Sequence, residues 1–167
     1  MAKINLPNLT TAIKTWGREL GFQQIGISDT SLMQAEKHLD DWVSKNYHGE
    51  MDYMVKHGKK RSHPESLIPG TKRIISVRMD YFPEDPVETQ AALDHPETAF
   101  ISRYALGRDY HKVIRNRLQK LCTRIEKEIG PFGYRAFVDS APVLEKAIAE
   151  KAGLGWIGKH TNLINKS

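Results

Sequence analysis

Asp139 is the residue best placed to do chemistry in this chain. It follows an apolar run, residues 134–138, that predicts a buried strand. Pro142 lies where a helix over 140–152 would begin, because the fixed φ of proline suits a first helical turn. Residues 153–158 (GLGWIG) hold three glycines in six positions, which permit positive φ or close backbone approach. The pattern predicts an acid at a strand end that faces a glycine-rich loop.

The residues alone leave two roles open for Asp139. As a helix N-cap, its side chain would accept a hydrogen bond from the first turn of the 140–152 helix. As a general acid, its carboxyl would have a pKa raised by the apolar neighbours Phe137, Val138 and Trp156. The two roles are compatible in part.

A basic segment covers residues 56–63 (KHGKKRSH). A run of this kind is commonly a solvated loop. It is also suited to bind an anion, and Arg61 is its best donor because a guanidinium offers a planar fork of N–H groups. Both interpretations of the segment remain open.

Two further polar groups lie at predicted element ends. Tyr104, between Arg103 and Arg108, lies at the end of a predicted strand. His160 and Lys159 come directly after the glycine turn, where they could assist an acid or satisfy buried carbonyl groups. Taken singly, the residues around Tyr104 favour a structural role.

Several common sites are excluded by spacing. None of the seven histidines has another at i+4, and Cys122 is the only cysteine, so no metal motif and no internal disulfide is predicted. A lone cysteine fits the cytoplasm. The G-x-G-x-x-G pattern of residues 153–158 follows a helix rather than a strand, which is the wrong context for dinucleotide binding.

Apolar periodicity supplies the elements that would position these residues. Helices are predicted between Pro7 and Gly21, over 31–46, from the cap Asp109 to Gly130, and over 140–152. Strands are predicted over 22–28, 73–81, 98–104 and 134–138. A long loop, of a length that is also typical of lids, is expected over 83–96.

The composition is that of a soluble globular domain. The 167 residues carry 40% hydrophobic side chains and a net charge of +5, which permits a phosphate or nucleic-acid partner without requiring one. No apolar run approaches the roughly 20 residues of a membrane span, and no signal peptide is visible. Alternating helices and strands predict an α/β (α+β) fold, a mixed sheet flanked by helices.

Longer motifs resemble one known family. Residues 139–145 (DSAPVLE) and 152–161 (AGLGWIGKHT) are similar to the epoxyqueuosine reductases, as are 103–111 (RYALGRDYH) and 51–54 (MDYM) with Arg61. The resemblance covers essentially the whole chain.

The resemblance implies a cobalamin-binding domain related to the nitroreductases and reductive dehalogenases. Two [4Fe-4S] clusters, fed by an external electron donor, would reduce the cobalt, and the epoxide of epoxyqueuosine in tRNA would become an alkene. It further implies Asp139 as proton donor beside the corrin, with Arg61, Tyr104 and His160 as cofactor contacts. A cytoplasmic monomer without membrane contact is expected.

The cysteine content departs from the family, because ferredoxin-type clusters need several cysteines. Residues 1–167 are therefore expected to form the N-terminal cobalamin-binding and catalytic portion, inactive alone, with the cluster domain after Ser167. Two alternatives remain: a basic RNA-binding module that uses residues 56–63, and a cofactor-free structural domain.

Overall fold

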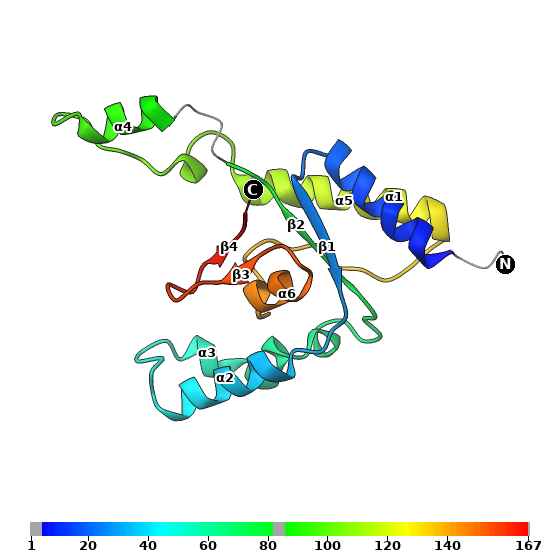
Figure 1. Cartoon of the computed structure of the whole chain (residues 1–167). Coiled ribbons are helices and arrows are strands. Elements are labelled where there is room, and N and C mark those ends of the chain that lie inside the picture. The colour runs from blue at the N-terminus through cyan, green and yellow to red at the C-terminus, as the bar shows by residue number, and fades with distance from the viewer. Residues whose placement is uncertain (1–4, 82–85, 167) are drawn as a thin grey trace.

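The computed structural model describes residues 5–81 and 86–166, a mixed α/β fold with two small sheets (Figure 1). The helices are α1 (Leu6–Glu19), α2 (Met33–Ser44), α3 (Tyr53–Lys56), α4 (Pro86–Asp94), α5 (Tyr110–Ile129) and α6 (Glu145–Lys151). The strands are β1 (Gln24–Ser28), β2 (Ile74–Arg78), β3 (Trp156–Ile157) and β4 (Leu163–Ile164). Short 3-10 turns cover Gly58–Arg61 (η1), Pro64–Ser66 (η2) and Arg103–Ala105 (η3).

The strands β1 and β2 form an antiparallel pair at the centre of the molecule. Gln24 lies opposite Arg78 and Ser28 lies opposite Ile74. Beyond the strand ends, the Gln23 side chain accepts a hydrogen bond of 2.8 Å from the Asp80 backbone, which prolongs the pairing. Two strands need a packed face for stability, so the helices around them are essential.

The main core lies where α1 and α5 cover one face of the β1–β2 pair (Figure 1). Its buried residues are Ile13, Phe22, Ile25, Leu121 and Ile125. Ile13 belongs to the apolar stripe of α1, and Leu121 and Ile125, four positions apart, belong to that of α5. One stripe from each helix thus meets Phe22 and Ile25 at the sheet. The predicted apolar faces of both helices are confirmed.

The opposite face of the pair carries α6 and the β3–β4 hairpin (Figure 1). Gly26 of β1 allows this packing, because a Cβ there would lie 2.4 Å from the Ala152 carbonyl oxygen. Lys151 fixes the end of α6 through a 2.6 Å ion pair with Asp29, just after β1. The segment that follows Asp139 is thereby held to the central strands.

Two predicted strands are wrong. Residues 134–138 form no strand in the described part of the chain, and residues 98–104 end in the η3 turn. An apolar run becomes a strand only when a neighbouring strand accepts its backbone hydrogen bonds, which a local pattern cannot supply. The result is two antiparallel pairs rather than one mixed sheet within the described ranges.

Two further expectations change. The helix predicted over 140–152 begins only at Glu145. The segment 83–96, expected to be a loop, contains the helix α4. The apolar residues of α4 do not gather on one face of the helix. Residues 83–85 lie outside the described residues. Propensity, rather than amphipathic periodicity, accounts for α4.

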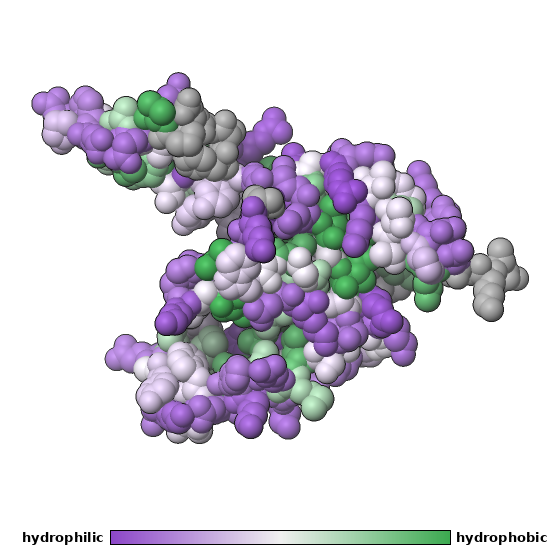
Figure 2. Space-filling model, viewed as in Figure 1, coloured by the Kyte–Doolittle hydropathy of each residue, from purple (hydrophilic) through white to green (hydrophobic). Residues whose placement is uncertain are grey.

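The visible surface is mainly hydrophilic, and hydrophobic residues gather over the central strands and the helices beside them (Figure 2). The same view shows the molecule hollowed between the α2–α3 region and the β3–β4 hairpin. In the described ranges, no helix is both long and apolar enough to cross a membrane.

Candidate active site

Asp139 is presented to solvent by a strained backbone. Its φ is +53°, in the left-handed region that costs most L-residues about 1 kcal/mol or more. Its side chain is 54% exposed. Leu144, not Asp139, precedes the first residue of α6, and the Leu144 side chain makes no cap. The helix-cap alternative is therefore excluded, and the strained geometry serves the placement of the carboxylate.

Tyr110 holds this carboxylate in place. Its hydroxyl donates a hydrogen bond of 2.5 Å to Oδ2 of Asp139. This bond, then burial and the Asp139 charge, raise the pKa of Tyr110 to about 12. The phenol therefore stays protonated at neutral pH and acts as a fixed donor.

The start of α5 fixes Tyr110 in turn. Asp109 caps the helix, as predicted, because its Oδ1 accepts a hydrogen bond of 3.0 Å from the His111 backbone. The cap sets where the first α5 side chains point, and so brings Tyr110 to Asp139.

His111 reaches the same carboxylate. Its Nε2 lies 3.7 Å from Oδ2 of Asp139, and its Nδ1 lies 3.0 Å from Oδ1 of Asp109. The imidazole stacks on the Tyr110 ring at 4.0 Å between centroids. The hydrogen bond from His111 is the largest cause that lowers the pKa of Asp109, which keeps that carboxylate ionised.

Tyr104 joins the site through an aromatic row. Its ring lies edge-on to Tyr110 and to Tyr81, with centroids 6.1 Å apart in both pairs. Such edge-to-face contacts are favourable. Tyr104 and Tyr81 are 53% and 60% exposed, so their faces remain open to a ligand. The structure thus brings two of the predicted site residues, Tyr104 and Asp139, together through Tyr110.

A second carboxyl group lies near Asp139. Burial, followed by the negative charge of Asp139, raises the pKa of Glu145 at the first position of α6. The candidate site therefore combines two acids, a phenol and an imidazole within a short span of loop and helix ends.

Arg61 contacts its own segment. Its Nε and one terminal nitrogen donate to the carbonyl oxygens of Met54 and Tyr53, at 3.3 and 2.7 Å. The Arg61 carbonyl accepts a hydrogen bond of 3.0 Å from the Leu144 backbone. Arg61 thus ties the basic segment to the chain that enters α6, and two of its three guanidinium nitrogens are already engaged.

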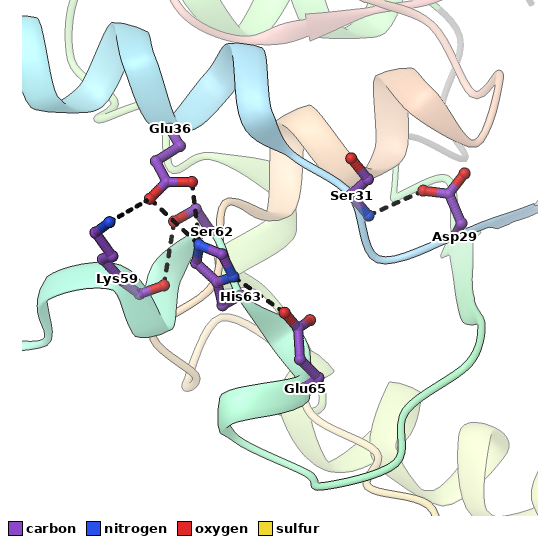
Figure 3. Close-up of polar contacts among 7 residues, drawn as sticks. All are labelled: Asp29, Ser31, Glu36, Lys59, Ser62, His63 and Glu65. Atoms are coloured by element: carbon purple, nitrogen blue, oxygen red, sulfur yellow. Dashed lines mark hydrogen bonds and ion pairs between the residues drawn. The ribbon is translucent and has the colours of Figure 1, made fainter.

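The rest of the basic segment is tied to α2 by His63. Its Nε2 lies 3.1 Å from Glu36 of α2 and its Nδ1 lies 3.0 Å from Glu65 (Figure 3). Lys59 lies 3.8 Å from the same Glu36 carboxylate. Hydrogen bonds that the His63 ring donates, first to Glu65 and then to Glu36, raise the pKa of His63. This network fixes a segment whose lysines remain exposed.

His160 lies apart from this cluster, in the turn between β3 and β4. Its Nδ1 accepts a hydrogen bond of 3.1 Å from the Asn162 backbone, which leaves Nε2 as the nitrogen that can meet a ligand. Among residues 5–81 and 86–166, no hydrogen bond or ion pair joins it to Asp139.

The glycines of the turn serve the chain itself. Gly153 has φ +78° directly after α6, as expected for a helix end. A Cβ at Gly155 would lie 2.1 Å from the Ile164 carbonyl oxygen, and one at Gly158 would meet the Ile164 side chain at 2.7 Å. Close backbone approach is therefore confirmed, but the approaching group is β4 rather than a ligand.

Sequence reasoning missed Tyr110 and His111 as site residues. Tyr110 continues the apolar stripe of the long helix, a pattern that favours packing over a role in a site. The available signal was their position inside the 103–111 motif, next to Tyr104.

The sequence of the chain is similar to those of known proteins. Residues 61–140, which include Arg61, Tyr104, Tyr110 and Asp139, match the family model described as epoxyqueuosine reductase QueG, DUF1730. The epoxyqueuosine reductase of Pseudomonas aeruginosa strain PAO1 is 65% identical over 158 residues, which covers 95% of this chain and 44% of that protein.

Solved structures agree in fold. The structure of epoxyqueuosine reductase from Streptococcus thermophilus has a TM-score of 0.77 and 27% identity, over 95% of this chain and 42% of that one. A crystal structure of epoxyqueuosine reductase with an epoxyqueuosine-modified tRNA-Tyr stem loop has a TM-score of 0.75 at 24% identity, over 95% and 42% of the two chains.

These relatives are reductases, which belong to the oxidoreductase class of enzymes. More particularly, the chain is a homologue of the epoxyqueuosine reductases, and it spans less than half the length of the relatives it matches.

Proposed function

We propose that this chain is the N-terminal, acid-bearing portion of an epoxyqueuosine reductase that acts on tRNA in the cytoplasm. The observation that carries the proposal is the Asp139 carboxylate, half exposed in a strained loop and held by Tyr110. It is supported by the 65% identity to a relative with that activity. The tRNA-bound relative supports tRNA as the partner.

The reaction needs a proton donor. Conversion of an epoxide to an alkene and water consumes two electrons and two protons. Asp139 would give one proton to the epoxide oxygen: its O–H bond breaks as the new O–H bond forms. Tyr110 would hold the Asp139 carboxyl in one orientation during this step, because its own proton is strongly retained.

The residues around Asp139 fit a corrinoid. A corrin is a broad, largely apolar ring with amide side chains, and the exposed Tyr81 and Tyr104 rings beside a carboxylate offer matching contacts. When bound, cobalamin would supply the reducing electrons at its cobalt. We assign Asp139, Tyr104, Arg61 and His160 as its contacts; His160 would use Nε2 and Arg61 its remaining guanidinium nitrogen.

The residues present do not fit an iron–sulfur cluster. Cluster ligands are thiolates, and the one cysteine of the chain lies half-buried on α5. Burial, then the charge of Glu126, raises the pKa of the Cys122 thiol to about 11. In this proposal the cluster ligands belong to residues beyond Ser167, and an external donor reduces the clusters there.

Replacement of Asp139 in the full-length enzyme tests the acid assignment. We expect Asp139→Ala to retain cobalamin, measured by its visible absorbance, and to slow queuosine formation in tRNA by about 100-fold or more. Asp40→Asn, on the exposed face of α2, is the matched control and should behave as wild type. Undiminished turnover in Asp139→Ala would show that another group is the acid.

A titration of the 167-residue chain with cob(II)alamin tests the cofactor contacts. We expect saturable absorbance changes that Tyr104→Ala weakens, because the substitution removes an exposed aromatic face. Tyr47→Ala provides the control, as Tyr47 is 66% exposed in another part of the fold. Equal affinities for the two variants would exclude Tyr104 as a contact.

A further inference from the structure

We propose that His111 is a positioning residue that returns a proton to Asp139 after each turnover, while Asp109 fixes the orientation of the His111 ring. The inference rests on the proposed function, since it presumes that Asp139 is the acid. It adds a source for the proton, which Asp139 alone does not provide.

The geometry is a line of three groups. Oδ1 of Asp109 lies 3.0 Å from Nδ1 of His111, and Nε2 of the same ring lies 3.7 Å from Oδ2 of Asp139. A carboxylate bonded to Nδ1 keeps a proton on that nitrogen, so Nε2 is the one that gains or loses a proton toward Asp139. This is the order of groups by which a carboxylate orients an imidazole toward a reacting partner.

Two side chains contact Oδ2 of Asp139, and only one of them can exchange a proton at neutral pH. The pKa of Tyr110 is raised to about 12, so its phenol holds its proton and serves as a fixed hydrogen-bond donor. An imidazole changes charge between about pH 5 and 8. His111 is also 43% exposed, so solvent can return its proton.

Stacking on Tyr110 further restrains the imidazole ring of His111. It stacks on Tyr110 with centroids 4.0 Å apart and an interplanar angle of 29°. Because Tyr110 itself bonds Asp139, the stack and the Asp109 contact hold the imidazole plane beside the acid. The 3.7 Å separation exceeds a hydrogen bond, so transfer needs a small side-chain rotation or one bridging water.

The proton transfer balances without any other reactant. After Asp139 gives its proton to the epoxide oxygen, the Nε2–H bond of imidazolium His111 breaks and an O–H bond forms on Oδ2. Neutral His111 then takes a proton from hydronium or a buffer acid in the solvent. No electron moves in this step.

Several acidic groups surround the His111 ring. Carboxylates lie on both sides, Asp109 and Asp139, and Glu145 adds a third acidic group near Asp139. Lys112 acts on Asp109 from the same turn of α5. The other titratable group in the cluster is Tyr104, whose charge acts on Tyr110.

The test is multiple-turnover reduction of epoxyqueuosine in tRNA by the full-length enzyme, in which Asp139 must regain its proton in every cycle, measured from pH 5.5 to 8.5. We expect the wild-type rate to fall as pH rises through the imidazole range. His111→Gln should be about 10- to 100-fold slower at pH 6 and should lack this fall. His111→Ala should recover speed when free imidazole is added, which a structural role would not explain. His38→Gln, exposed on α2, is the matched control and should keep the wild-type profile.

The outcomes separate this inference from the proposed function. If Asp139→Asn is inactive while His111→Gln keeps the wild-type rate and pH profile, the inference fails and the acid assignment stands. It also fails if His111→Gln is slow with an unchanged pH profile and imidazole gives no rescue. An active Asp139→Asn enzyme would overturn the acid assignment itself.

Discussion

The hydroxyl of Tyr110 lies 2.5 Å from Oδ2 of Asp139, although 29 positions separate the two residues in the chain. The contact joins the start of α5 to the loop before α6. It also orients a carboxylate whose backbone has positive φ. The candidate site is therefore built from the ends of elements, where side chains can converge without disturbing the core.

Tyr110→Phe should remove the hydrogen bond to Asp139 and leave the fold intact. The substitution removes only the hydroxyl, so Asp139 loses its fixed donor while the ring keeps its packing against Tyr104 and His111. We expect an activity loss of about 10-fold in the full-length enzyme, smaller than that of Asp139→Ala. Tyr134→Phe, on a tyrosine that bonds Gln119, is the control and should be active. A Tyr110→Phe enzyme with wild-type activity would show that Asp139 needs no such donor.

The raised pKa of Tyr110 can be measured directly. Ultraviolet titration of the chain should show one tyrosine that ionises near pH 12 rather than its ordinary 10.0, and this late step should move down in Asp139→Asn. Because the folded pKa is raised, the associated stability is fully present below pH 10 and is lost between about pH 10 and 12. If no tyrosine ionises near pH 12, the hydrogen bond between Tyr110 and Asp139 is contradicted.

The His63 network should stabilise the chain more in mild acid than at alkaline pH. Glu65 and Glu36 raise the pKa of His63, so this contribution is complete below the ordinary 6.5 and is lost as pH rises through the raised value. His63→Gln should lower stability at pH 6 by no more than about 1 kcal/mol, the range of surface ion pairs, and by less at pH 9. Thermal unfolding at both values measures this, with His57→Gln as the control. If His63→Gln lowers stability equally at the two pH values, the ion pairs of protonated His63 with Glu36 and Glu65 are not the source of the loss.

Gly155→Ala should destabilise the β3–β4 hairpin. Its Cβ would lie 2.1 Å from the Ile164 carbonyl oxygen, a backbone atom that cannot turn away. We expect a loss of roughly 1–3 kcal/mol in unfolding free energy. Gly133→Ala is the matched control: no atom lies within 4 Å of its Cβ, so it should be neutral or slightly stabilising. Equal stability of the two variants in denaturant unfolding would contradict the role assigned to Gly155.

The elements with strong periodicity were predictable. The stripes of α1 and α5 and the alternation of β2 come from local side-chain order, and each packs as predicted around Phe22 and Leu121. The outcome for residues 134–138 was not predictable in the same way, because a strand needs a neighbouring strand to pair with, and the described residues provide none for this run.

The sequence by itself determined the helices of the core and the Asp109 cap, and it placed Asp139 within a long motif that resembles one family. Only the tertiary structure decided what Asp139 does locally. It removed the cap role, since α6 starts at Glu145, and it brought Tyr110 and His111 to the carboxylate. The physical reason is range: periodicity and caps act within a few residues, whereas these contacts depend on how α5 and α6 pack around the central strands.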